Sequence, residues 1–151
     1  MPGSPTTSVQ RIEALLQFGA TSVVLREAFF GVRRFDQFQR NLEISRSVLT
    51  RTLKFMVEQG LLQRRLYQNR PDRYEYRLSE SGIELYPMFL AMKAWGDRWL
   101  GGDAGRVILH HELCGKDCSP RVTCDRCGKP VHAREVRYRI EPPPADDAGA
   151  L

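Results

Sequence analysis

The sequence predicts a mainly α-helical domain that carries a small β wing, followed by a small C-terminal β module that is rich in cysteine. Apolar residues recur at helical spacing through most of residues 9–100, and two strand-like runs interrupt them between residues 61 and 78. All four cysteines lie between Cys114 and Cys127. A chain of 151 residues has room for one conventional core and a small appendage. We therefore expect one main domain over 9–100 and the module over 104–140.

The composition is compatible with a folded protein, because 42% of the residues are hydrophobic, 27% are charged and the net charge is +5. No cationic start followed by an apolar run indicates a secretion signal, and no stretch approaches the roughly 20 apolar residues of a membrane-spanning helix. We therefore expect a cytoplasmic protein. Residues 1–8 and 141–151 hold too few large apolar side chains to order themselves, so we expect two disordered tails.

Two amphipathic helices are predicted at the start of the main domain. Within residues 9–18 and 21–30 the apolar positions return every three or four residues, which is the period of an α-helix. These positions are Val9, Ile12, Leu15 and Leu16 in the first segment and Val24, Leu25, Ala28 and Phe29 in the second. Gly19 and Gly31 follow the two segments and predict their ends.

A helix-turn-helix is predicted next. Residues 35–40 form its first short helix, and Ile44 with Ser45 forms the turn, in which Ser45 is the N-cap of a second helix over 46–59. Apolar side chains of the second helix form a stripe that we expect to be buried, at Leu49, Leu53, Met56 and Val57. Its opposite face is polar and cationic, with Arg46, Ser47, Thr50, Arg51 and Lys54.

A β-hairpin wing is predicted after Gly60. Residues 61–67 and 73–78 are strand-like, and the turn-rich loop 68–72 joins them. From Arg33 to Arg77, eleven Lys and Arg residues stand against five acidic residues, a net charge of +6. So cationic a segment predicts a polyanion as its partner.

A long helix is predicted from its N-cap, Ser79, to about Leu100, with a bend or a break at Pro87. Its apolar residues follow the alternating spacing of three and four that paired helices use. They are Leu85, Met88, Met92, Trp95 and Trp99. A second apolar flank, formed by Tyr86, Phe89 and Leu90, requires a second neighbour, so we expect this helix to pack on its own domain and on a second subunit. The alternative is a single helix buried in the core.

In residues 25–39, 45–53, 73–82 and 95–99, the chain resembles the HxlR family of winged helix-turn-helix transcriptional regulators. The resemblance implies a homodimer, built from the first and last helices of the domain, that binds a pseudo-palindromic operator in double-stranded DNA. The family usually has a Trp at the position of Ala20, and many members have a Cys near the start of the first helix. This chain has no cysteine before Cys114, so redox sensing at the family's position is not expected.

The second helix of the helix-turn-helix carries the residues that we expect to read DNA bases. A helix with a cationic face fits the major groove, where Arg can bind guanine and Ser or Thr can reach base edges or phosphates. We assign readout to Arg46, Ser47, Thr50 and Arg51, and a phosphate contact to Lys54. Cationic side chains of a wing commonly reach the backbone or the minor groove. In this wing they are Arg64, Arg65, Arg70 and Arg73.

The cysteine-rich module contains two copies of one pattern, ligand-x-x-ligand-Gly, at residues 111–115 and 124–128. The glycine allows a tight turn, and two such turns supply the four ligands of a structural Zn²⁺. We expect the ligands to be His111, Cys114, Cys124 and Cys127, in a zinc-ribbon-like module with strands at 107–109, 121–123 and 136–138. Cys118 or His110 could replace His111. The alternatives to zinc are a disulfide switch, Cys114 with Cys118 or Cys124 with Cys127, and reduced, buried thiols.

The leading functional hypothesis is therefore a sequence-specific DNA-binding transcriptional regulator. The alternatives are a zinc-ribbon module for protein interaction or architectural DNA binding, and a thiol/disulfide redox-responsive regulator that uses the C-terminal cysteines. No nucleophile–base pair, phosphate loop or paired carboxylates indicate an enzyme. A small-molecule effector is a further alternative, because aromatic residues could line a pocket, although such residues at helical spacing are more often core. They are Phe29, Phe30, Phe89, Trp95 and Trp99.

Overall fold

The computed structural model describes residues 8–101, 107–137 and 139. The chain divides into two compact units, Met1–Gly102 and Asp103–Leu151. The predicted disordered tails lie outside the described residues, except Ser8, which begins the first helix. No helix in the described part of the chain is long and apolar enough to cross a membrane.

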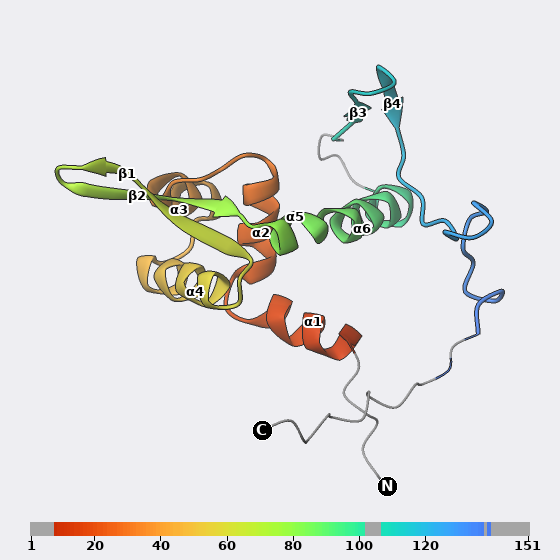
Figure 1. Ribbon diagram of the computed structural model, residues 1–151, viewed down its shortest axis with the longest axis horizontal. Coiled ribbons are helices and arrows are strands. Elements are labelled where there is room, and N and C mark those ends of the chain that lie inside the picture. The colour runs from red at the N-terminus through yellow and green to blue at the C-terminus, as the bar shows by residue number, and fades with distance from the viewer. Residues whose placement is uncertain (1–7, 102–106, 138, 140–151) are drawn as a thin grey trace, which may run out of the picture. The chain divides into compact units, whose positions relative to one another are not determined.

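The first unit is mainly helical and carries one β-hairpin (Figure 1). Its order in the chain is α1 (Ser8–Gln17), α2 (Thr21–Phe29), α3 (Phe35–Leu42), α4 (Arg46–Glu58), β1 (Leu62–Asn69), β2 (Asp72–Leu78), α5 (Glu80–Glu84) and α6 (Tyr86–Trp99). The predicted helix-turn-helix corresponds to α3 and α4, and the predicted wing to β1 and β2. The predicted type and order agree with the structure from α1 to β2, and α5 and α6 together occupy the place of the predicted long helix.

The core of the first unit is formed mainly by α2, α3 and α4. Its largest apolar side chains, each with at most 2% of its surface exposed, are Val24, Leu25, Phe38, Leu49, Leu53, Met56 and Leu62. The predicted stripe of α4 is confirmed at Leu49, Leu53 and Met56, whereas Val57 is only half-buried. Burying this stripe turns the opposite, polar face of α4 to the surface.

Thr52 also belongs to the core, although the apolar pattern does not identify it. Its Oγ1 accepts a hydrogen bond of 3.1 Å from the backbone N–H of Ala20, the residue that precedes α2. Gly19 makes this approach possible, because a Cβ at that position would lie 2.7 Å from Thr52 Oγ1 and its φ is +54°. One polar side chain therefore joins the start of α2 to α4.

The wing is an antiparallel hairpin in which Leu62 pairs with Leu78, with an irregularity after Leu66. Its strands run further than predicted and leave only residues 70–71 between them, because residues 68–69 and 72 also pair. Arg34 forms an antiparallel bridge with Glu75, which attaches the segment before α3 to the wing. The wing is therefore fixed to the helix-turn-helix along one edge.

The predicted long helix is divided into α5 and α6 at Leu85, with Pro87 in the first turn of α6. Ser79 caps α5 as expected, since its Oγ accepts a hydrogen bond of 3.1 Å from the Gly82 N–H. Only one edge of α6 packs on the core, where the Phe29 ring lies 5.1 Å from that of Phe89. No residue of α6 is buried, so the alternative of a helix enclosed in the core is wrong.

The second unit contains a small antiparallel hairpin, β3 (Leu109–His111) and β4 (Lys116–Cys118). The predicted strand 107–109 begins later, at Leu109, because the pairing closes around the tight turn 112–115. The predicted strand 121–123 is reduced to a single bridge between Thr123 and Pro130. Residues 136–137 form no strand, and residue 138 lies outside the described residues.

Candidate nucleic-acid interface

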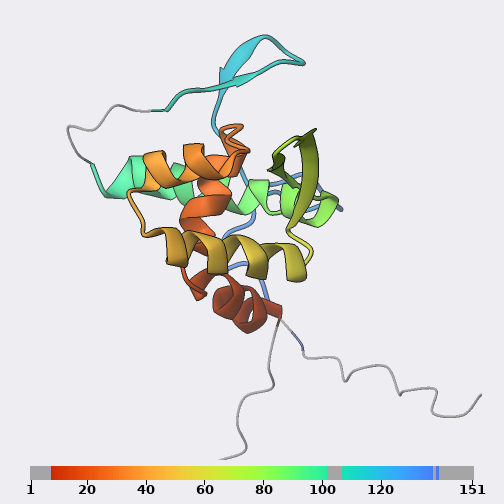
Figure 2. The same ribbon diagram turned by 90° about the vertical axis from the view of Figure 1, so that its left-hand side faces the viewer.

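The turn between α3 and α4 determines how α4 is presented. Glu43 ends α3 in the left-handed conformation, with φ 52°, and reverses the chain. The Ser45 Oγ accepts a hydrogen bond of 3.3 Å from the Val48 N–H, which confirms Ser45 as the N-cap of α4. Seen from the wing end, α4 runs across the front of the unit with the wing beside it (Figure 2). In its first turns, Arg46, Ser47 and Thr50 are exposed.

The five residues predicted to contact DNA from α4 are all exposed: Arg46, Ser47, Thr50, Arg51 and Lys54. The Arg46 guanidinium lies over the Phe35 ring, 5.0 Å from its centroid, which limits the side chain's freedom at the start of the helix. The Thr50 hydroxyl donates a 2.8 Å hydrogen bond to the Arg46 carbonyl. Its oxygen can still accept a hydrogen bond from an external donor.

Two cations further along α4 have partners of their own. The Arg51 guanidinium lies 5.7 Å from the centroid of the Phe18 ring, between α1 and α2. The Lys54 Nζ lies 3.7 Å from the Glu58 carboxylate one turn later. Exposed ion pairs of this kind contribute little, so Lys54 can exchange Glu58 for a phosphate at small cost.

The predicted arginines of the wing are exposed as well: Arg64, Arg65, Arg70 and Arg73. Arg64 lies 3.5 Å from the centroid of the Tyr74 ring, and Arg65 donates a hydrogen bond of 3.1 Å to Gln63. Neighbouring residues of a strand point to opposite faces, so Arg64 and Arg65 cannot contact DNA on the same side of the wing.

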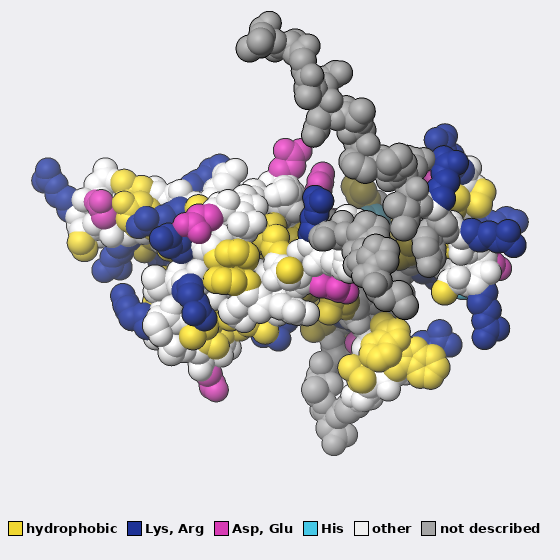
Figure 3. Space-filling view, turned by 90° about the horizontal axis from the view of Figure 1, so that it is seen from below, with side chains coloured by type: hydrophobic (Ala, Val, Ile, Leu, Met, Phe, Trp, Pro, Cys, Tyr) yellow, Lys and Arg dark blue, Asp and Glu magenta, His cyan; other side chains and the backbone are white. Residues whose placement is uncertain are grey.

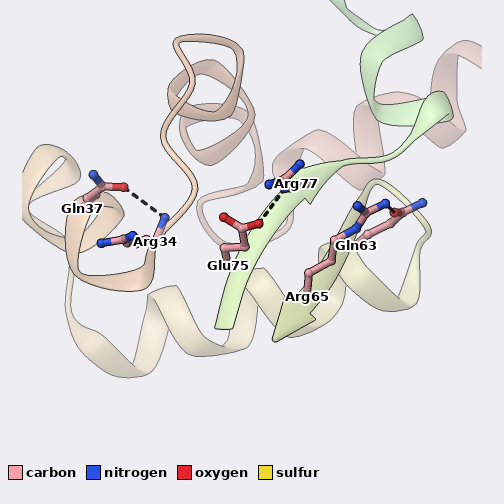
Figure 4. A network of polar contacts seen from close by, with 6 residues as sticks. All are labelled: Arg34, Gln37, Gln63, Arg65, Glu75 and Arg77. Atoms are coloured by element: carbon pink, nitrogen blue, oxygen red, sulfur yellow. Dashed lines mark hydrogen bonds and ion pairs between the residues drawn. The ribbon is translucent and has the colours of Figure 1, made fainter. Parts of the chain in front are cut away.

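The opposite strand of the wing holds a cation that is already paired. Arg77 forms an ion pair of 2.7 Å with Glu75, which lies opposite Arg65 (Figure 4). Because Glu75 neutralises it, Arg77 adds little to the positive charge of the surface, although it is one of the eleven cations of the segment from Arg33 to Arg77. At the start of α3, Figure 4 also shows the Arg34 N–H donating to the Gln37 side chain, a hydrogen bond of 3.2 Å.

A groove of about 610 Å³ lies where α3, the start of α4 and the wing meet. It combines cationic and aromatic side chains with two carboxylates: Arg34, Arg46, Arg73, Phe35, Tyr67, Tyr74, Tyr76, Asp36 and Asp72. Figure 3, seen from the side of α4, shows Lys and Arg side chains gathered over this end of the unit. Such a surface suits the sugar-phosphate backbone of DNA.

Arg34 is a member of this surface that the helical and strand patterns did not single out. Its guanidinium lies 4.6 Å from the centroid of the Tyr67 ring, on the wing. Arg34 precedes α3 in the sequence and belongs to neither predicted element of the interface. Its signals in the sequence were its place within the +6 segment and within residues 25–39 of the family resemblance, and neither says which face a side chain occupies.

The residues predicted to form a dimer seam are divided by the fold. Leu85 and Met88 are half-buried, whereas Met92, Trp95 and Trp99 have 59%, 58% and 63% of their surface exposed. The aromatic residues considered as an effector pocket are divided in the same way. Phe29 and Phe89 pack against each other, while Phe30 and the two tryptophans lie on the surface.

The predicted metal ligands occur as two separate pairs. In the first pair, the His111 Nδ1 lies 3.4 Å from the Cys114 Sγ. In the second pair, the Cys124 thiol accepts hydrogen bonds from the backbone and the side chain of Cys127. In the described parts of the second unit, no three His, Cys, Asp or Glu side chains come together as a metal-binding group. Cys118 is exposed at the end of β4, and His110 contacts Asp117.

Comparison with known proteins identifies the family. The HxlR-like helix-turn-helix family matches residues 20–104, which is more than half of the chain. The protein belongs to the HxlR family. It is therefore a DNA-binding transcriptional regulator of the helix-turn-helix type and not an enzyme.

Individual relatives support the membership. The HxlR protein is 44% identical over 130 residues to the uncharacterized HTH-type transcriptional regulator Rv3095 of Mycobacterium tuberculosis, covering 85% of this chain and 82% of the relative. This match is longer than the 102 residues of the first unit, so it extends into the second. The crystal structure of PA1607, a candidate transcription factor, has a TM-score of 0.76 at 26% identity over 91% of this chain and 97% of that one. The solved structure of PA1374, a candidate transcription factor from Pseudomonas aeruginosa, has a TM-score of 0.61 at 30% identity. The match covers 91% of this chain and 93% of that one.

Proposed function

We propose that this HxlR protein regulates transcription as a homodimer that reads a pseudo-palindromic operator. The observation that supports this most strongly is the polar face of α4, whose exposed residues stand opposite a buried apolar stripe. Because that stripe fixes the rotation of α4 about its axis, the same face is presented in every molecule. A fixed polar face beside a wing is the arrangement by which helix-turn-helix proteins place a helix in the major groove.

Base readout is assigned to the first two turns of α4. Arg46 and Arg51 can each bind the O6 and N7 atoms of a guanine, and Ser47 and Thr50 can contact base edges or phosphates. The stacking of Arg46 on Phe35 reduces the side-chain entropy that binding would remove. Pairs of this bidentate kind are each worth about 1–3 kcal/mol of discrimination against the wrong base.

Backbone contacts are assigned to the cations around this helix. Lys54, with its ammonium exposed beside Glu58, is placed to meet phosphate. The wing residues Arg70 and Arg73, one of the two opposed residues Arg64 and Arg65, and Arg34 in the groove add contacts to the backbone or the minor groove. These contacts set the register of the protein on the duplex and carry most of its salt dependence.

Dimerisation is assigned to α6, with α1 as its neighbour in the interface. Met92, Trp95 and Trp99 continue the three-four spacing of the seam and are more than half exposed in the single chain. No residue of α1 is buried, and Val9 is 59% exposed. Apolar surface of this extent on ordered helices is typical of a protein interface. A second copy of the chain would cover it and present two α4 helices to one duplex.

Selection of bound duplexes from a random DNA pool tests the proposal. We expect the enriched sequences to share an inverted repeat whose half-sites lie about one helical turn, roughly 34 Å, apart. Affinity for a selected duplex should exceed affinity for random duplex by about 10³ or more at physiological salt. Enrichment of a single half-site would contradict the dimer, and equal affinity for selected and random duplexes would identify an architectural DNA-binding protein. Footprinting on the DNA upstream of the protein's own gene provides a second measurement.

A further inference from the structure

The described residues of the second unit form ordered turns but no apolar core. None of the described residues 107–137 is buried, and Ile108, Leu113 and Val122 are 68%, 92% and 64% exposed. Units of fewer than about 40 residues usually need a disulfide, a metal or a partner chain to stay folded. A cross-link through its own side chains would supply stability that apolar burial in the described residues does not.

The turn at residues 111–115, which we name the first knuckle, is tight and is closed by backbone hydrogen bonds. The N–H groups of Cys114 and Gly115 both donate to the His111 carbonyl, at 3.1 and 2.8 Å. Gly115 has a φ of 64°, a conformation that favours glycine. This turn brings the His111 Nδ1 to 3.4 Å from the Cys114 Sγ, so the two side chains face one point.

The turn at residues 124–128, the second knuckle, repeats that geometry. The Gly128 N–H donates to the Cys124 carbonyl at 2.8 Å, and Gly128 has a φ of 69°. The Cys124 N–H donates to the Lys129 carbonyl at 2.9 Å, which closes the loop. Both knuckles thus share three features. The glycine directly follows the second candidate ligand, its N–H donates at 2.8 Å to the carbonyl of the first one, and its φ is positive.

The second knuckle also brings its two thiols together. The Cys124 thiol accepts hydrogen bonds from the Arg126 backbone, from the Cys127 backbone and from the Cys127 side chain. Each pair of candidate ligands is thus formed within its own turn.

We propose that the two knuckles bind one Zn²⁺ ion through His111, Cys114, Cys124 and Cys127. Two sulfur-containing pairs supply the four ligands of a tetrahedral structural site, and the glycine after each pair keeps the backbone clear of the ion. The knuckles do not meet in the described structure, since no three potential ligands are grouped there. The ion is the link between them, which is how small metal-binding units couple ligand binding to folding.

The strand pairing of the hairpin decides between His111 and its neighbours. His110 pairs with Asp117 across the hairpin, and its Nδ1 lies 3.1 Å from that carboxylate, so His110 is engaged on the other face. Cys118 pairs with Leu109 and therefore shares the face of His111. Cys118 is the rival fourth ligand, whereas His110 is not.

Elemental analysis of the full chain, purified under reducing conditions without chelator, tests the site. We expect one equivalent of zinc, and replacement by Co²⁺ should give the intense visible absorption of a tetrahedral site and the ultraviolet charge-transfer band of a thiolate ligand. Cys124→Ser and Cys127→Ser should each lose the metal. His132→Ala is the matched control, because it removes a histidine of the same unit that belongs to neither knuckle, and it should keep one equivalent.

Three outcomes would overturn the proposal in whole or in part. Less than a tenth of an equivalent of zinc, together with four titratable thiols, would show that the cysteines are merely reduced. A mass 2 Da lower without zinc would show a disulfide instead. Full zinc in His111→Ala with loss in Cys118→Ser would replace His111 by Cys118 in the ligand set. These readouts do not depend on DNA, so they stand whatever the outcome of the operator experiments.

Discussion

Thr52 is a polar residue at the centre of the helical core, and its single hydrogen bond to the Ala20 N–H joins α4 to the start of α2. Thr52→Val should destabilise the protein by about 1–3 kcal/mol, because it keeps the shape of the side chain and leaves the buried N–H without an acceptor. Thr52→Ser is the matched control, since it retains the hydroxyl and loses only a methyl group. Urea unfolding measures both variants. A smaller loss for Val than for Ser would contradict this role.

Arg51 and Arg70 are exposed cations that we expect to act differently, one through bases and the other through phosphate. Arg51→Ala should lose about 1–3 kcal/mol of binding to the selected operator and much less to random duplex. Arg70→Ala should weaken both duplexes alike and lower the slope of log affinity against log salt by about one unit. Arg26→Ala, on α2 and paired with Glu27, controls for loss of charge alone. If Arg51→Ala also weakened binding to both duplexes equally, the assigned roles would be contradicted.

At the scale of a helix, α6 is notable because its packed and exposed faces are separate. Phe89 packs on the core, while Trp95 is 58% exposed on a face that nothing in the described single chain buries. Trp95→Ala should weaken the proposed dimer by about 2 kcal/mol or more, as tryptophan truncation does at the centre of interfaces. Sedimentation equilibrium over a range of concentrations measures this. Leu66→Ala, which removes an exposed apolar residue of the wing, should leave the dimer unchanged.

A monomeric wild-type protein at micromolar concentration, with tight operator binding retained, would refute the α6 interface. Unchanged dimerisation in Trp95→Ala would move the interface to another surface, and α1 would then be the next candidate. The apolar residues of α6 that pack within the chain, Leu85 and Phe89, are unsuitable for this test. Their replacement would disturb the core and the dimer together.

At the scale of the whole molecule, the two units should respond independently to loss of the proposed zinc. The first unit has a core of its own, whereas the described part of the second has none. Structural zinc contributes on the order of 10 kcal/mol to the folding of small sites. Cys124→Ser should therefore make residues 107–137 sensitive to protease while the helical circular dichroism and the operator affinity stay close to wild type. Unfolding of the first unit in this variant would contradict the independence of the units.

The sequence by itself determined those features that depend on local spacing. The apolar period of α4 predicted which residues are buried and, with them, which polar residues are exposed, because a helix of known period has only one way to bury its stripe. Ser45 and Ser79 were predicted as caps for a similarly local reason, since a cap contacts a backbone N–H three residues away. The family followed from several such local motifs in a fixed order.

The tertiary structure alone decided the features that depend on residues far apart in the chain. Arg34 joins the interface because the segment before α3 pairs with β2, and Thr52 is buried because Gly19 lets α4 approach it closely. The faces of Arg64 and Arg65 depended on where β1 pairs with β2. Contacts of this kind arise from packing between elements, and the period or charge of one segment carries no information about its partner's position.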